Sequence, residues 1–185
     1  MERKDALFLI GEYVKNQNSI KHMLATEAIM IALANKFRED EKKWGLTGLL
    51  HDLDMEIVDY ANNPENHGFQ TVKILEEKGV EKSILEAIKA HNQATGKVPE
   101  TLMEKAIYCT DPLTGLIVAS VLVIPSRKIS DLNSSSVLKR FKEKAFARGA
   151  NREIIMKCSE IGLELEEFIE IGFNAMKGIR EDLGF

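Results

Sequence analysis

Four histidines are the residues of this sequence that are best suited to chemistry, and each lies at or near the end of a predicted helix. His51 is followed directly by Asp52, and Asp111 interrupts an otherwise apolar stretch. Imidazole nitrogens and carboxylate oxygens are ligands of zinc, iron and manganese. On one helical turn an adjacent histidine and aspartate point about a quarter-turn apart, close enough to bind one ion or to bridge two.

The setting of two of these residues also favours a metal. Asp111, within an apolar helix, would be costly to bury in its ionised form without a positive partner. A histidine must be neutral to bind a metal, and His67 is expected in a first helical turn, where the helix dipole disfavours the imidazolium form. The candidate ligands of one or two divalent transition-metal ions (iron, manganese or zinc) are His22, His51, Asp52, His67, His91 and Asp111.

Several roles stay open at this point. His67 and His91 would either bind a second ion or line the pocket and touch the substrate. Asp54 is a candidate general acid or base, or simply a loop residue after a helix. Arg127 and Lys128 follow an apolar helix, where they would hold a phosphate group or form a solvated basic turn.

Helical periodicity dominates the chain, and turn signals divide it into the elements that must position these residues. The spacing predicts helices over 19–38, 42–52 and 64–78, with Ser19 as the N-cap of the first and Pro64 in the first turn of the third.

Capping-box spacing predicts two further helix starts, at Ser83 and at Thr101. The helix from Thr101 contains Pro112, so it either stops at residue 110 or continues to about residue 124 with a kink. Its second half, 113–123, is apolar on nearly every side. That is typical of a central buried helix, although the valine and isoleucine content would also suit a buried strand.

Composition and patterning predict one all-α domain over 1–185. The metal-site core is expected over about 19–124, and C-terminal helices over about 137–182, in two segments of 137–148 and 152–180. The length is enough for a substantial hydrophobic core. No strand alternation, internal repeat or low-complexity linker is present.

Charge and cysteine content narrow the function classes. A net charge of −4 does not provide the basic face of a free-standing nucleic-acid binder. The two cysteines have no close spacing, and the longest apolar run is too short to span a bilayer. We therefore expect a cytoplasmic protein with a small-molecule substrate and neither nucleic acid nor a membrane as partner; nothing indicates the oligomeric state.

The order of these residues resembles a known family. His22, the dipeptide His51-Asp52 and then Asp111 follow the pattern of the HD superfamily of metal-dependent phosphohydrolases, and the text "LTGLLHDLDME" looks like the helix that presents its doublet. His67 and His91 resemble the two extra histidines of relatives with a two-metal centre. The group most similar is that of small HDIG-type predicted hydrolases, and the resemblance covers roughly residues 19–123.

The resemblance implies an HD-type helical bundle and a metal-dependent phosphomonoesterase or phosphodiesterase that acts on a nucleotide-like or other small phosphate ester. Asp52 would bind metal, and in a two-metal site it would bridge the ions. The lysine that some relatives carry after the doublet is absent, and Asp54 to Glu56 occupy that region. Two other functions stay open: a non-catalytic module that binds a nucleotide or metal, and a di-iron oxygenase.

Overall fold

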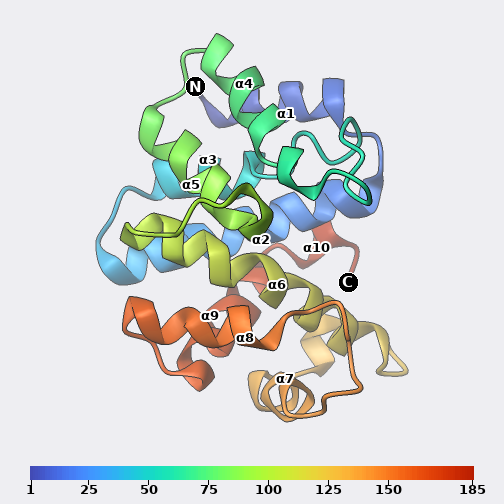
Figure 1. Cartoon of the computed structure of the whole chain (residues 1–185). Coiled ribbons are helices and arrows are strands. Elements are labelled where there is room, and N and C mark those ends of the chain that lie inside the picture. Colours follow the sequence, from blue (N-terminus) through green and yellow to red (C-terminus); the bar gives the residue numbers. More distant parts are fainter.

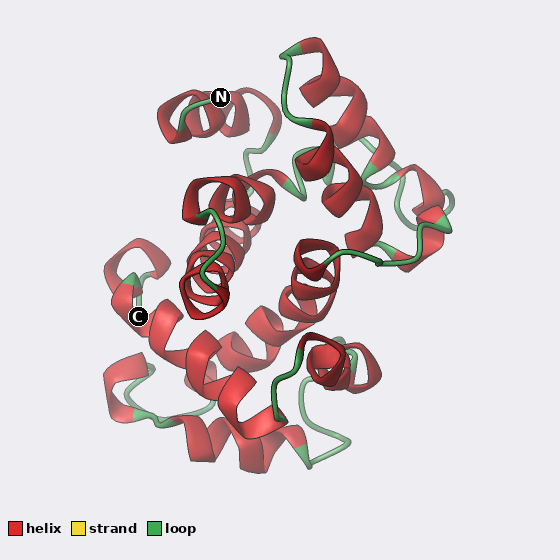
Figure 2. Ribbon diagram, turned by 90° about the vertical axis from the view of Figure 1, so that its left-hand side faces the viewer, coloured by secondary structure: helices red, strands yellow, loops and turns green.

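The computed structural model describes residues 1–185 and consists of helices and loops without a strand, which confirms the all-α prediction (Figure 2). Four short 3-10 turns, of which Pro64–Asn66 bears on the site, separate some of the α-helices. The α-helices are α1 (Arg3–Tyr13), α2 (Gln17–Phe37), α3 (Glu41–Leu50), α4 (Phe69–Glu77), α5 (Lys82–His91), α6 (Leu102–Leu122), α7 (Ser134–Phe141), α8 (Arg152–Met156), α9 (Leu165–Gly178) and α10 (Arg180–Leu183).

Two long helices, α2 and α6, form the centre of the molecule (Figure 1). Helix α2 packs against α3, α6 and α9, and α5 packs against α6. The helices α1, α3, α4 and α5 lie on one side of α6, and the C-terminal helices α7 to α9 lie on the other. The two long helices therefore run between the N-terminal and C-terminal parts of the fold.

The hydrophobic core has two parts. One lies between α2, α6 and the C-terminal helices and includes Ile29, Ile107 and Phe168, which are fully buried. The other joins α1, α3, α4 and α5 through residues such as Leu49 and packs against the start of α2. Leu24 of α2 contacts both parts. Helix α2 therefore links the two parts of the core.

Helix α6 continues through Pro112 to Leu122, so the alternative of a stop at residue 110 and that of a buried strand are both wrong. Its start at Leu102 follows a complete capping box between Thr101 and Glu104, as predicted. By length and composition α6 would be able to cross a membrane, but 61% of its most apolar window is buried inside the protein. That position is typical of a core helix.

Three predicted helix starts are wrong. The N-cap of α2 is Asn16, whose side chain accepts hydrogen bonds from two backbone N–H groups, so the helix begins before Ser19. Pro64 opens only a 3-10 turn, and α4 begins later, at Phe69. Helix α5 begins at Lys82, and the hydroxyl of Ser83 donates to Glu81 instead of forming a capping box.

The C-terminal part is more broken than the sequence predicts. Helix α7 ends at Phe141 instead of reaching residue 148. In place of one helix over 152–180 there are α8, a 3-10 turn, α9 and α10. Gly162 separates the first two from α9 because its φ of 77° is left-handed, a conformation that ends helices.

Candidate metal centre

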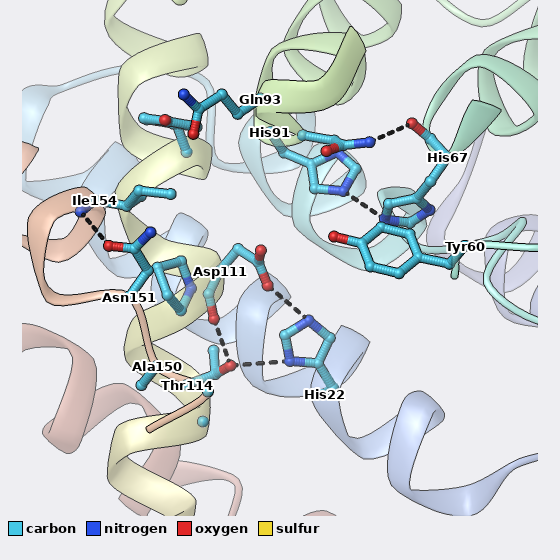
Figure 3. A pocket seen from close by; sticks show the side chains of 15 residues that line it. His22, Tyr60, His67, His91, Gln93, Asp111, Thr114, Ala150, Asn151 and Ile154 are labelled. Carbon is cyan, nitrogen blue, oxygen red and sulfur yellow. Dashed lines mark hydrogen bonds and ion pairs between the residues drawn. The ribbon is translucent and has the colours of Figure 1, made fainter. Parts of the chain in front are cut away.

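Six chemically active side chains from distant segments meet in one place. The contributing segments are α2, the end of α3, the loop before α4, the end of α5 and the middle of α6. Figure 3 shows the pocket side of this arrangement, where three of the imidazoles and a carboxylate point toward a common space. In chain order the six residues are His22, His51, Asp52, His67, His91 and Asp111.

Close packing of α3 on α2 sets the first two imidazoles together. A Cβ atom at Gly48 of α3 would lie 2.8 Å from the backbone of Thr26 and Glu27 in α2, so only glycine allows this approach. One turn later His51 follows the last residue of α3, and its Nε2 lies 3.1 Å from Nε2 of His22.

Asp52 lies between two pairs of histidines. Its Oδ2 is 3.4 Å from Nε2 of His22, and its Oδ1 is 3.3 Å from Nε2 of His51. The same Oδ1 lies 3.2 Å from Nε2 of His67 and 3.5 Å from Nε2 of His91. Two groups of potential ligand atoms result, one on each side, and Asp52 is common to both. Asp52 is therefore placed to contact an ion held by either group.

Asp111 joins the first of these groups. Its Oδ1 lies 3.0 Å from Nε2 of His22 and 3.9 Å from Nε2 of His51. It projects from α6 one residue before Pro112, on the side that faces the histidines (Figure 3). On the other side, Asp52 is the one carboxylate that lies near the Nε2 atoms of His67 and His91. The two groups therefore differ in their ligand sets.

Each imidazole has a partner for its other nitrogen. Nδ1 of His51 is 2.8 Å from the carbonyl oxygen of Gly48, and Nδ1 of His91 is 2.5 Å from that of Ile88. A carbonyl oxygen only accepts, so both Nδ1 atoms carry hydrogen, and in the neutral ring the lone pair of Nε2 is then free to bind a metal. This arrangement orients histidines as metal ligands.

His22 and His67 are held in the same manner by side chains. The hydroxyl of Thr114 donates to the backbone carbonyl of Asp111 and lies 2.9 Å from Nδ1 of His22, from which it accepts (Figure 3). Nδ1 of His67 donates to Oδ1 of Asp54 at 2.7 Å. Thus all four Nε2 atoms face the centre.

Asp54 does not act as predicted. It is fully buried, and its Oδ2 accepts hydrogen bonds from the backbone N–H groups of Gly68 and Thr71. Gly68 reaches this position with a φ of 90°, which favours glycine. Because both oxygens face His67 and the start of α4, Asp54 lies behind the ligand histidine and cannot reach a substrate. It is a positioning residue and not a general acid or base.

The electrostatic balance is dominated by the two central carboxylates. Burial opposes the charged form of His22, but hydrogen bonding to Asp111 and the charge of Asp52 raise its pKa to about 9. Burial likewise opposes the charge on His67, yet Asp52 and Asp54 raise its pKa to about 10. This reverses the sequence-based argument from the helix dipole, because two carboxylates contact the ring and α4 begins only after it.

The residues present fit a metal ion. Two pairs of Nε2 atoms, His22 with His51 and His67 with His91, lie 3.1 Å and 3.0 Å apart, which is unfavourable unless a proton or a cation lies between the two nitrogens of each pair. The carboxylates of Asp52 and Asp111 supply negative charge at the same place. Imidazole with carboxylate is a donor set for zinc, iron or manganese.

A cavity of about 480 Å³ opens beside this centre (Figure 3). Neither Arg127 nor Lys128 lines it, so the role of these two residues in holding a phosphate stays a prediction. Both are exposed in the loop after α6, and Lys128 also lies outside the second cavity that reaches His22. The polar side chains that line the first cavity beyond the ligands include Tyr60, Asn92, Gln93, Tyr108 and Asn151.

Sequence reasoning missed several residues that position the site. Thr114 fixes His22, Gly48 allows the contact of α3 with α2, and Asn92 donates to the backbone carbonyl of His67. The Tyr60 ring packs edge-on against His67 at 5.4 Å between centroids. The spacing of Asp111 and Thr114 on one helical face was a usable signal, whereas nothing local marks Asn92 or Tyr60.

The comparison with protein-family models agrees with this geometry. The HD domain model matches residues 19–115, which is more than half of the chain and includes all six residues of the centre. No curated protein and no solved structure gives a significant match. The order and geometry of the histidines and aspartates, together with this match, show that the chain belongs to the HD domain family.

Proposed function

We propose that this protein is a metal-dependent phosphohydrolase that cleaves a small, nucleotide-like phosphate ester. The family consists mostly of metal-dependent hydrolases. The observation that carries the proposal is the convergence of the four imidazole Nε2 atoms on Asp52, with every Nδ1 atom beside an acceptor. A degenerate binding module would have no need to retain all four orientations.

The residues of the centre have separable roles in this proposal. His22, His51 and Asp111 would hold one divalent ion, His67 and His91 would hold a second, and Asp52 would bridge them. Bound ions supply positive charge that polarises a phosphoryl group and makes water acidic enough to act as a nucleophile near neutral pH.

The surrounding residues hold the geometry and the substrate. Asp54 and Thr114 keep the imidazole rings of His67 and His22 oriented. On the cavity side, Tyr60 and Gln93 have polar groups that no other residue of the protein engages, and both are exposed toward solvent. They are suited to hydrogen bonds with a neutral sugar or base.

The test is hydrolysis by protein loaded with Mn²⁺ or Fe²⁺ of a panel of phosphomonoesters and phosphodiesters. We expect phosphate release from at least one member, and a loss of at least a hundredfold for Asp52→Asn, which keeps the size of the side chain and removes its charge. The matched control is Asp59→Asn, an exposed aspartate a few residues along the same segment, which should keep full activity.

Three results would contradict the proposal. Equal turnover by Asp52→Asn and the unaltered protein would remove the centre from the reaction. Oxygen consumption by the ferrous protein without phosphate release would instead favour the oxygenase alternative. Stabilisation by nucleotides without turnover under any metal would favour a binding module.

A further inference from the structure

A second cavity, of about 570 Å³, also reaches the metal centre. It shares His22, Thr114 and Gly115 with the cavity of Figure 3, so the two spaces meet along one turn of α6. Unlike the first cavity, it has a largely hydrophobic lining. Its apolar side chains are Val118, Leu122, Leu183 and Phe185.

Two cations distinguish this second cavity. Lys21 and Arg127 line it, whereas neither lysine nor arginine lines the cavity of Figure 3. The ion pairs of lysine and arginine in the protein all involve other residues, so both cations lack a carboxylate partner. The ammonium group of half-buried Lys21 lies against Gly184, where a Cβ atom would be 2.8 Å from Nζ.

Gly115 keeps the junction between the cavities open. It lines both of them, and a Cβ atom placed on it would meet nothing within 4 Å. Lys21 precedes His22 directly in α2, so the unpaired ammonium group and the candidate metal ligand belong to the same helical turn. An extended ligand can therefore contact the centre and the second cavity at once.

We propose that the second cavity is a substrate subsite that takes an apolar part of the phosphate ester and a second anionic group, which pairs with Lys21 and Arg127. The ligand class is an organic anion with an apolar body, whether the anion is a carboxylate or a phosphate. Two unpaired cations beside an apolar lining attract such a ligand by charge and by burial of its apolar surface. As a subsite of the reaction, the proposal rests on the proposed function.

Direct binding tests the subsite independently of catalysis. The probe is naphthalene-1-sulfonate, titrated into the metal-loaded protein by isothermal calorimetry. We expect one equivalent to bind, and Lys21→Gln and Arg127→Gln each to weaken binding about fivefold. The matched control is Lys128→Gln, which removes the neighbouring exposed cation outside the cavity and should leave the Kd unchanged. Absence of binding, or an equal Kd in all four proteins, overturns the proposal.

Kinetics then tests whether the subsite serves the reaction. The unaltered protein should cleave 4-carboxyphenyl phosphate with a lower KM than phenyl phosphate. Arg127→Gln should raise the KM for 4-carboxyphenyl phosphate about fivefold relative to the KM for phenyl phosphate. Lys128→Gln should leave the ratio of the two KM values unchanged. A preference unaffected by Arg127→Gln overturns the substrate role. Failure of the unaltered protein to cleave any phosphate ester would instead refute the proposed function, while the calorimetry still decides whether the anion site exists.

Discussion

At the scale of single residues, the site depends on which nitrogen of each imidazole carries hydrogen. His51 and His91 have Nδ1 beside a backbone carbonyl of their own helix, so helix geometry alone fixes them. His67 depends on a distant carboxylate, that of Asp54, which two backbone N–H groups hold in place. The orientation of His67 is therefore one that a single conservative substitution can release.

Asp54→Asn should weaken metal binding without unfolding the protein. An amide in place of the carboxylate removes the charge-assisted bond to His67, and its NH₂ group faces either that ring or the backbone N–H groups of Gly68 and Thr71. Loss of such a supporting carboxylate lowers metal affinity about 10- to 100-fold. We expect elemental analysis to find fewer ions per chain than in the unaltered protein, with rescue of activity at higher metal concentration. Asp59→Asn is the exposed control, and unchanged metal content in Asp54→Asn would contradict the role.

The stability of the metal-free protein should fall as pH rises. The pKa of His22 is raised to about 9 and that of His67 to about 10, from an ordinary value of 6.5. A raised pKa contributes stability that is complete below the unfolded value and is lost as pH passes through the folded value. The thermal midpoint of chelator-treated protein should therefore decline between pH 6.5 and pH 10. His67→Gln should reduce the decline, and a midpoint that rises over this range would refute the explanation.

How far the sequence leads at this scale depends on how far apart the interacting residues lie. The doublet His51-Asp52 and Asp111 stand out because histidine and aspartate are unusual within apolar helices. The role of Asp54 was not predictable, since its three partners lie 13 to 17 residues away in a loop whose fold depends on Gly68. The effect of Asp52 on the pKa of His67 was hidden for the same reason.

At the scale of elements, the site depends on how closely α3 approaches α2. Gly48 lies against the backbone of Thr26, and Gly45 lies against the side chain of Ile31, where a Cβ atom would be 2.9 Å from Cγ1. Glycine normally weakens a helix, so its presence at both positions costs stability that the packing must offset. The close contact is what brings His51 to His22.

Gly48→Ala should destabilise the protein although alanine is the better helix former. The added Cβ atom would meet backbone atoms at 2.8 Å, which cannot move as a flexible side chain does. We expect the free energy of unfolding to fall by about 1–3 kcal/mol in urea titrations. Gly11→Ala is the control, because Gly11 lies in α1 with nothing within 4 Å, and it should raise that free energy by up to about 1 kcal/mol. A stabilising effect of Gly48→Ala would show that the contact is loose.

Helix existence was predictable from the sequence where apolar periodicity is long, as in α2 and α6, and helix ends were predictable only where a cap acts locally. The capping box at Thr101 is correct because both partners lie within one turn. Pro64 and Ser83 mislead because proline also suits a 3-10 turn and serine has a nearer partner in Glu81. The break at Gly162 needs a left-handed residue, and glycine allows but does not require one.

At the scale of the whole molecule, the centre joins the two parts of the core. Asp111 belongs to α6, whose apolar side chains lie in the core part with the C-terminal helices, whereas His91 belongs to α5, whose apolar side chains lie mostly in the core part of α1, α3 and α4 although α5 also packs against α6. His22 belongs to α2, which contacts both. Ions held by these residues would cross-link segments that are up to 89 residues apart in sequence, from His22 to Asp111. Metal binding should thus stabilise the entire fold and not a single loop.

Removal of metal should therefore lower the thermal midpoint in one cooperative step. A ligand present at 100 times its Kd stabilises the folded state by about 2.7 kcal/mol, and 1 kcal/mol shifts the midpoint of a chain of this size by about 2–4 °C. We expect the chelated protein to unfold roughly 5–10 °C below the manganese-loaded one in scanning calorimetry, with one transition in both states. Asp52→Asn should show little of this shift, because the residue common to both groups of ligands is lost. Two separate transitions after chelation would instead mean that the cores fold independently and that the centre does not couple them.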